Sequence, residues 1–295
     1  MPNRSRNCCS GSSNVIKERF LHNNVQVIEP AKSLRLVDPF DLWRWRDLFL
    51  ALMVRDIAVR YKQTAIGIAW VVVQPLATVA IFSFLLGKIG NVPTGGLPYP
   101  LFAFAAMVPW QMFSRAMLEG SMSLASNRSL VTKAYFPRVL MPAAAVFGGA
   151  VDFAITFVIL LVMMMWFGFF PSWQIVLTPL LLLLALLTSL GIALWFSALN
   201  VLYRDVQFLL PFLTQVWLFL TPVLYPASVI PERWRVLYAI NPMVTVTESF
   251  RWAMLGGATA PEPLMLVISA VTVFAMLVSG MAYFRYVERQ MADRI

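Results

Sequence analysis

The sequence predicts an all-α integral membrane protein with six transmembrane helices, and three observations support this prediction. First, residues 153–203 form a run of 51 residues without a charged side chain. As a helix this run would extend about 75 Å, whereas the hydrocarbon core of a bilayer is about 30 Å thick. Second, the chain is 60% hydrophobic and 13% charged, while soluble domains carry about a quarter of their residues as Asp, Glu, Lys and Arg. Third, more charge-free intervals of crossing length lie on both sides of the long run.

Charged residues and turn formers set the borders of the crossings. The long run must cross the bilayer and return, and Pro171–Gln174 is its only plausible turn. A separate crossing starts after Arg138 and contains Asp152. The predicted helices cover about 64–87, 99–118, 139–169, 173–202, 206–225 and 264–284, within a transmembrane domain over 63–290.

The distribution of Lys and Arg predicts the orientation. With the N-terminus inside, 19 of the 23 Lys and Arg residues fall on the cytoplasmic side. The four exceptions are Lys88, Arg233, Arg235 and Arg251. Because the membrane potential and anionic lipids hold positive charge on the cytoplasmic side, both termini are predicted to be cytoplasmic.

Different regions flank the transmembrane domain. Residues 1–37 are polar and predict a mobile cytoplasmic leader, and residues 291–295 form a cytoplasmic tail. Over 38–62, an apolar stripe lies opposite a polar one, which predicts an amphipathic helix in the membrane interface. The apolar stripe is Leu42, Trp45, Phe49, Leu52 and Met53, and the polar one is Asp41, Arg44 and Asp47. A packed cytoplasmic helix is the alternative.

The segment before the last crossing, about 227–260, combines prolines and glycines with an apolar interior. Pro231 and Pro242 suit the first turns of two short helices. These helices would dip into the outer leaflet as a periplasmic re-entrant hairpin, in which non-helical backbone needs protein or water around it. An ordinary surface loop is the alternative.

Groups that catalysis or nucleotide binding would need are missing from the sequence. The single histidine, His22, and the adjacent Cys8 and Cys9 all lie in the leader. No Gly-x-x-x-x-Gly-Lys-Ser/Thr segment occurs, so the chain does not cradle ATP in that way. We therefore expect no enzyme active site, metal site or bound cofactor in this chain, and we expect its energy source to lie elsewhere. The net charge of +9 reflects cytoplasmic anchoring of the membrane protein rather than a nucleic-acid partner.

Asp152 is the one acidic residue expected inside a crossing. A carboxylate near the bilayer centre costs about 3 kcal/mol on insertion scales, so it should face protein or water. Both a functional role and a helix-packing role stay open. Glu119, with Arg115 one turn earlier, is expected to mark the cytoplasmic end of the second helix.

Segments along most of the chain match one family in order. Arg55–Trp70 resembles the segment that leads into the first helix of polysaccharide-exporting type-2 ABC transporter permeases. The further matches are Gln74-Pro75, Pro109-Trp110, Lys133-Ala134-Tyr135-Phe136-Pro137-Arg138, Tyr203-Arg204-Asp205, Thr221-Pro222-Val223 and Asn241-Pro242. The resemblance covers about residues 40–290, and its motifs are specific as an ordered set.

This resemblance implies a homodimer in the bacterial cytoplasmic (inner) membrane, joined to two copies of a separate ABC ATPase that binds ATP and Mg²⁺. The implied substrate is a lipid-linked polysaccharide such as the O antigen of lipopolysaccharide, capsule or teichoic acid, carried through a channel at the dimer interface. A type-2 permease for a small hydrophobic compound or drug is the alternative, and a membrane-embedded glycan enzyme is a more distant one.

The resemblance also suggests where the chain couples to its ATPase. By position, Ser126–Arg138 is similar to the main coupling helix, and the turn after the fourth helix provides a second contact. The candidates are Arg128, Lys133, Tyr135, Phe136, Arg138, Arg204 and Asp205. The cationic members can equally be cytoplasmic anchors.

Substrate contacts are expected at two places. Arg55, Arg60, Tyr61 and Lys62 lie just before the first crossing, where cationic donors would suit a pyrophosphate head group; binding of anionic membrane lipid competes with this interpretation. A sugar chain needs a passage with aromatic faces. The channel-lining candidates on the first two helices are Trp70, Phe82, Phe84, Phe102, Phe104, Trp110 and Phe113, for each of which packing or interface anchoring is the alternative.

Overall fold

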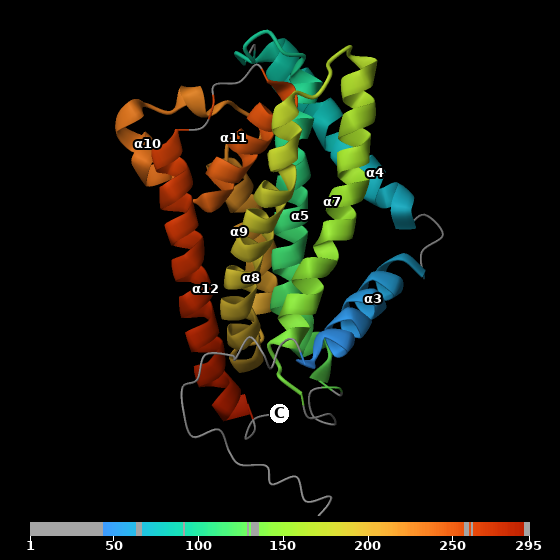
Figure 1. Ribbon diagram of the computed structural model, residues 1–295, viewed down its shortest axis with the longest axis vertical. Helices are drawn as coiled ribbons and strands as arrows, with labels where there is room; N and C mark the ends of the chain where they lie inside the picture. Colours follow the sequence, from blue (N-terminus) through green and yellow to red (C-terminus); the bar gives the residue numbers. More distant parts are fainter. Residues whose placement is uncertain are drawn as a thin grey trace, which may run out of the picture. The chain divides into compact units, whose positions relative to one another are not determined.

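The computed structural model describes residues 44–62, 67–90, 92–128, 130, 136–256, 260 and 262–291. The predicted leader, the start of the predicted amphipathic helix and residues 292–295 lie outside these ranges. The described residues form helices and connecting turns and contain no strand, as Figure 1 shows.

The helices follow the chain in this order. They are α3 (Arg46–Lys62), α4 (Gly67–Phe82) with its π-helical continuation (Ser83–Ile89), α5 (Tyr99–Ser126), α7 (Leu140–Trp166), a 3₁₀ turn (Trp173–Leu177) leading into α8 (Thr178–Leu202), α9 (Val206–Leu220), a 3₁₀ turn (Ala227–Val229), α10 (Glu232–Tyr238), α11 (Pro242–Leu255) and α12 (Pro263–Met291).

Within the described ranges, five helical segments are long and apolar enough to cross a membrane. They are Val72–Ile89, Tyr99–Ser126, Leu140–Trp166, Trp173–Leu202 and Pro263–Gln290. The apolar helix α9 is shorter, with 15 residues, and reaches about 22 Å at 1.5 Å per residue. It ends at Leu220, before Pro222, whereas the sequence predicted a helix to residue 225; Pro222 carries no amide hydrogen to continue the ladder.

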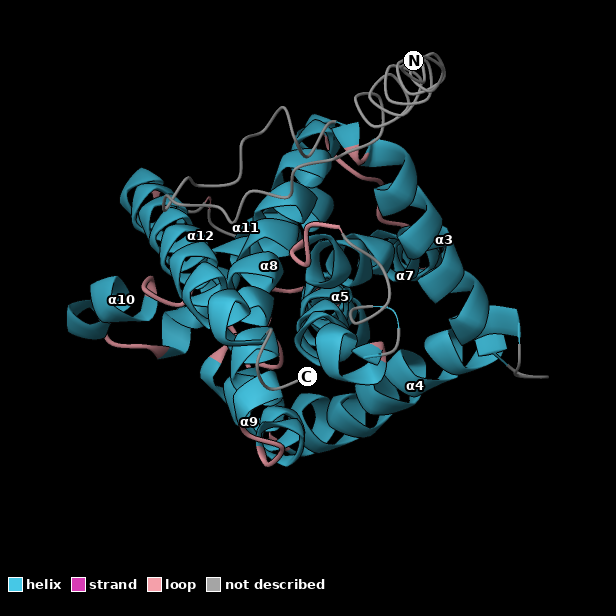
Figure 2. Cartoon of the chain, turned by 90° about the horizontal axis from the view of Figure 1, so that it is seen from below, coloured by secondary structure: helices cyan, strands magenta, loops and turns pink. Residues whose placement is uncertain are grey.

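Helix α5 occupies the centre of the bundle, as the view in Figure 2 shows. It packs chiefly against α7 and α8, and also contacts α4, α9 and α11. Small residues allow this close approach: a Cβ added to Gly120 would come within 2.7 Å of Ala193 on α8 and Val146 on α7. Close backbone approach through small residues is how helices associate where surrounding lipid is as apolar as their own side chains.

Helices α8 and α12 pack together in the same way. The carbonyl oxygen of Gly191 would lie 2.6 Å from a Cβ added to Gly280, so the two backbones touch. Next to this contact, the Trp195 and Tyr283 rings stack with centroids 4.5 Å apart. The glycines therefore determine the distance between the two helices.

The second helix is longer than the sequence predicted, because it continues past residue 118 to Ser126. Arg115 and Glu119 were expected to end it. Both instead form ion pairs with residues of other helices, so their charges are compensated within the protein and the helix continues.

Helix α3 is less amphipathic than the sequence predicted. Its apolar stripe, including the buried Leu52 and the half-buried Phe49 and Met53, packs on α7 and its neighbours. The opposite side is also apolar over most of its length, with Leu50, Val54 and Val59 exposed. The polar stripe ends at Asp47 because the later positions on that side are occupied by aliphatic residues, so α3 is a packed helix with a second apolar face.

Candidate functional site

An ionic cluster joins three helices around Asp152, whose side chain is 6% exposed. Arg60 of α3 binds it through Nη1, at 2.5 Å from Oδ2, and the adjacent Tyr61 hydroxyl donates to Oδ1. From α5, Arg115 lies 3.5 Å from Oδ1. Arg60 also forms a salt bridge with Glu119 of α5. Asp152 therefore has three partners, none of them on its own helix.

The position of Asp152 within α7 explains why it needs these partners. It is the thirteenth residue of a helix that starts at Leu140, about 18 Å from that end. An isolated carboxylate at this depth would be costly, but a paired one with its lone pairs hydrogen-bonded is tolerated. The cluster contains two arginines and two carboxylates, so its formal charge is balanced.

Tyr61 takes part as a neutral donor. Burial, and then the hydrogen bond to Asp152, raise the pKa of Tyr61 from its ordinary value of 10.0 to about 12. The phenol hydrogen is therefore retained at physiological pH, and the Asp152 carboxylate accepts a hydrogen bond from it.

The four predicted head-group contacts are placed differently from one another. Arg60 and Tyr61 are engaged in the cluster, so a phosphate reaching Arg60 would compete with two carboxylates. Arg55 is half-buried and pairs with the adjacent Asp56 at 2.8 Å. The side chain of Lys62 lies outside the described residues.

The predicted channel-lining rings separate into two groups. Phe102, Phe104, Trp110 and Phe113 are buried within the subunit. Phe113, for example, packs edge-on against Trp217 of α9 and lies beside Trp110. Phe82 is half-buried and Phe84 is 58% exposed, and the Trp70 side chain lies outside the described residues.

The two predicted coupling regions lie at one end of the bundle. Asn200, near the end of α8, donates to the Ser121 carbonyl near the end of α5, at 3.4 Å. Arg128 is exposed beyond α5, and Arg204 and Asp205 are exposed beyond α8. Lys133 and Tyr135 lie outside the described residues.

The residues that follow this gap return the chain to the bundle. Phe136 is buried in a cluster with Leu124 and Phe284. Arg138 is half-buried, and its Nη1 atom has no hydrogen-bond partner within the described part of the chain. Within the predicted coupling segment, Ser126–Arg138, Arg128 is therefore exposed near the start and Phe136 is anchored near the end.

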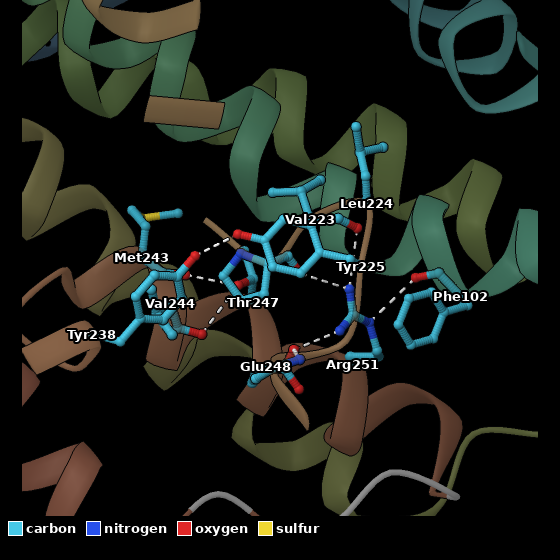
Figure 3. Close-up of polar contacts among 12 residues, drawn as sticks. Phe102, Val223, Leu224, Tyr225, Tyr238, Met243, Val244, Thr247, Glu248 and Arg251 are labelled. Carbon is cyan, nitrogen blue, oxygen red and sulfur yellow. Dashed lines mark hydrogen bonds and ion pairs between the residues drawn. The ribbon is translucent and has the colours of Figure 1, made fainter. Parts of the chain in front are cut away.

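Arg251, which the sequence places only among the charges outside the membrane, is a buried residue. Its side chain is fully buried on α11. It donates to the carbonyls of Phe102, Pro222 and Val223 and to Glu248. Figure 3 shows Arg251 together with its partners Phe102, Val223 and Glu248. Its guanidinium also lies 3.8 Å from the centroid of the Phe102 ring. One side chain therefore binds the backbone after α9, the start of α5 and α11.

A sequence signal for this role exists. Arg251 is the only cation in the apolar stretch 243–255, and Arg presents several donors in one plane.

The described residues contain no group of three or more His, Cys, Asp or Glu that could hold a metal ion.

Comparisons with known proteins agree with the motifs of the sequence. Residues 47–255 match the ABC-2 type transporter family. The chain is 30% identical over 261 residues to the O-antigen export system permease protein RfbA of Myxococcus xanthus, covering 86% of this chain and 98% of that protein. It is 26% identical to RfbA of Klebsiella pneumoniae, covering 84% and 94%. It is 25% identical to the polysialic acid transport protein KpsM of Escherichia coli, covering 82% and 93%. The chain belongs to the ABC-2 type transporter family.

Proposed function

We propose that this chain is the membrane-spanning permease subunit of an ATP-driven exporter that moves lipid-linked polysaccharide across the bacterial cytoplasmic membrane. The similarity to RfbA carries this proposal, because it extends over 98% of that protein's length. The similarity to KpsM, over 93% of its length, points to the same class of substrate. ATP is hydrolysed by a separate ATPase subunit.

The proposed topology has six crossings, with both termini in the cytoplasm. The five long helical segments provide five of them, and α9 with the turn after it provides the sixth. Helices α10 and α11 form a re-entrant hairpin on the outer side. The exposed Arg128 and Arg204 support a cytoplasmic location for their end of the bundle.

That end contacts the ATPase in this proposal. Arg128 and the pair Arg204–Asp205 are exposed there, and the predicted contacts Lys133 and Tyr135 belong to the same segment. Phe136 and Arg138 connect that segment to the bundle. Movement of the ATPase would reach α5 and α7 directly, because this segment links the two helices.

The passage lies at a homodimer interface in this proposal. The segment Val72–Ile89 is exposed over most of its surface in a single copy, which leaves it available to a second subunit or to lipid. We place Trp70, Phe82 and Phe84 at the passage. Phe102, Phe104, Trp110 and Phe113 form the packed wall behind it.

Arg55 and Lys62 are proposed to contact the lipid pyrophosphate. Arg60 and Tyr61 join them only when the Asp152 cluster opens, because their hydrogen-bonding groups are otherwise occupied. This arrangement would couple head-group arrival to movement of α3.

Deletion and complementation test the proposed function. The native host should lose surface polysaccharide when the chain is deleted and regain it with the wild-type chain and an intact partner ATPase. A partner ATPase unable to hydrolyse ATP should not restore it. The purified chain alone should hydrolyse no ATP. If deletion instead leaves surface polysaccharide unchanged and sensitises cells to hydrophobic drugs, the drug-permease alternative replaces this proposal.

A further inference from the structure

A cavity of about 450 Å³ lies at the end of the bundle opposite the coupling segments. It is bounded by the loop before α5, the stretch 226–230, α10, α11 and the start of α12. Pockets for small organic ligands have volumes of about 300–1,000 Å³. The cavity is partly open, so a ligand could reach it without unfolding the hairpin.

The charges of the cavity wall are paired. Arg251 and Glu248 form a salt bridge at 2.6 Å, and Arg235 and Glu262 lie 3.7 Å apart. Since each cation has a carboxylate partner, the wall offers no uncompensated charge to attract an ion. The geometry favours a neutral ligand.

Glu248 keeps one oxygen available. Its Oε1 accepts from Arg251 at 2.6 Å and from the Ala227 amide at 3.3 Å. Its Oε2 accepts no hydrogen bond within the described part of the chain, and the side chain is 22% exposed. A carboxylate oxygen covered by an apolar ligand would lose its water without replacement, which is costly. A ligand hydroxyl would satisfy it.

The rest of the wall combines hydroxyl groups with apolar side chains. Ser228 provides an exposed hydroxyl, and Thr94 and Thr245 add hydroxyls that already bond to the Leu97 carbonyl and to Ser269. Leu97 and Met265 provide apolar surface. A pyranose ring presents the same two kinds of surface, with hydroxyls around its edge and C–H groups on its faces. An entirely apolar compound would leave the polar groups of this lining without partners.

We propose that this cavity binds one neutral sugar unit of the exported polysaccharide where the chain leaves the membrane. This inference rests on the proposed function and adds a site for the substrate. The site lies against the outer hairpin and contains none of the channel-lining candidates except Phe102.

Photocrosslinking in the native host, with its own glycan and ATPase, tests the site. The exposed Ser228 lines the cavity, whereas its neighbour Val229 is 60% exposed and does not. Ser228→p-benzoylphenylalanine should yield a permease band that carries glycan after irradiation, and Val229→p-benzoylphenylalanine should not. Glycan on neither variant, or equally on both, would overturn the proposal. Surface polysaccharide is measured separately in the wild-type host and in the host from which the chain is deleted. Failure of the proposed function can therefore be distinguished from failure of the proposed sugar site.

Saturation-transfer NMR tests the ligand class on the purified full-length chain in nanodiscs. Methyl α-D-glucopyranoside and methyl α-D-mannopyranoside are the neutral probes, glucuronate is the anionic probe and naphthalene the apolar one. Filling the cavity by Ser228→Trp should weaken the signal of a neutral glycoside about tenfold, the equivalent of one or two hydrogen bonds, while Val229→Trp should not. A Ser228-dependent signal from glucuronate or naphthalene only, or from no probe, would overturn the assignment to a neutral sugar.

Discussion

Arg60 and Asp152 are 92 positions apart in the sequence, yet their side chains meet at 2.5 Å. The pair joins α3 to the interior of α7. Because Arg60 also binds Glu119 of α5, one guanidinium connects three helices. This guanidinium therefore helps to hold α3 against α5 and α7.

Removing Arg60 should release α3 and destabilise the fold. Arg60→Ala leaves the buried Asp152 carboxylate with fewer partners, and breaking a buried ion pair costs about 3–5 kcal/mol. Thermal unfolding of the purified protein in detergent measures the loss. Arg55→Ala is the control, since among the described residues Arg55 pairs only with its neighbour Asp56 and a partly exposed pair contributes about 0–1 kcal/mol. Equal losses in the two variants would contradict the role given to the cluster.

Alkaline pH should weaken the same contact through Tyr61. The pKa of Tyr61 is raised to about 12 in the folded protein, so the folded state favours the neutral phenol. This contribution is complete below about pH 10 and is lost as the pH rises from about 10 to 12. The melting temperature of the wild type should fall over this range by more than that of Tyr61→Phe, which has no hydroxyl to ionise. Parallel pH curves would show that Tyr61 does not contribute.

Replacing Arg251 should detach α11 and the segment before it from the core. Arg251→Met keeps the apolar stem but removes the charged donor that binds three backbone carbonyls and Glu248, at a cost of about 3–5 kcal/mol. Arg251→Lys should be intermediate because it keeps the charge but not the planar set of donors. Protease cleavage within 227–260 measures the release. Arg233→Ala, at an exposed position, should leave the cleavage rate unchanged.

The contact between α8 and α12 should not tolerate a methyl group. In Gly280→Ala the new Cβ would lie 2.6 Å from the Gly191 carbonyl oxygen, so the helices must separate, at a cost of about 1–3 kcal/mol. Gly148→Ala is the matched control, because its Cβ would first meet Ile57 at 3.7 Å. Detergent unfolding should show a loss for the first variant and little change for the second.

The topology predicts opposite labelling at the two ends. In a variant whose Cys8 and Cys9 are replaced by serine, Arg128→Cys and Arg204→Cys should react with a membrane-impermeant maleimide only after cells are opened. Ser228→Cys should react in intact cells. Labelling of Arg128→Cys from outside would invert the orientation and remove the coupling role of that end.

The sequence located the long apolar helices because uncharged runs must be buried in lipid or protein, and the observed α7 and α8 lie in the intervals 139–169 and 173–202. It could not assign the length of α5, since the charges of Arg115 and Glu119 are compensated by α3 and α7. Local sequence carries no information about such distant partners. The family resemblance depends on motifs ordered along the chain and not on contacts between distant side chains. The match of residues 47–255 to the ABC-2 type transporter family confirms it.

The aromatic candidates show another limit of sequence analysis. Helix α4 and the first half of α5 carry apolar residues on nearly every side, so periodicity does not separate faces toward lipid, core or passage. The burial of Phe104 and Phe113 depends on which helices surround α5. Arg251 could have been noticed as a lone cation in an apolar segment, but its carbonyl partners come from distant turns and could not be named.

The central position of α5 has a consequence for biogenesis. Of the five candidate crossings it is the least apolar and the most covered by protein. Its free energy of transfer from the translocon into lipid is therefore the least favourable of the five. The helices that cover it, α7 and α8, are translated later. Insertion of α5 should therefore be delayed or incomplete until the ribosome has synthesised both, and truncation of the nascent chain before residue 202 should leave α5 exposed to quality-control proteases.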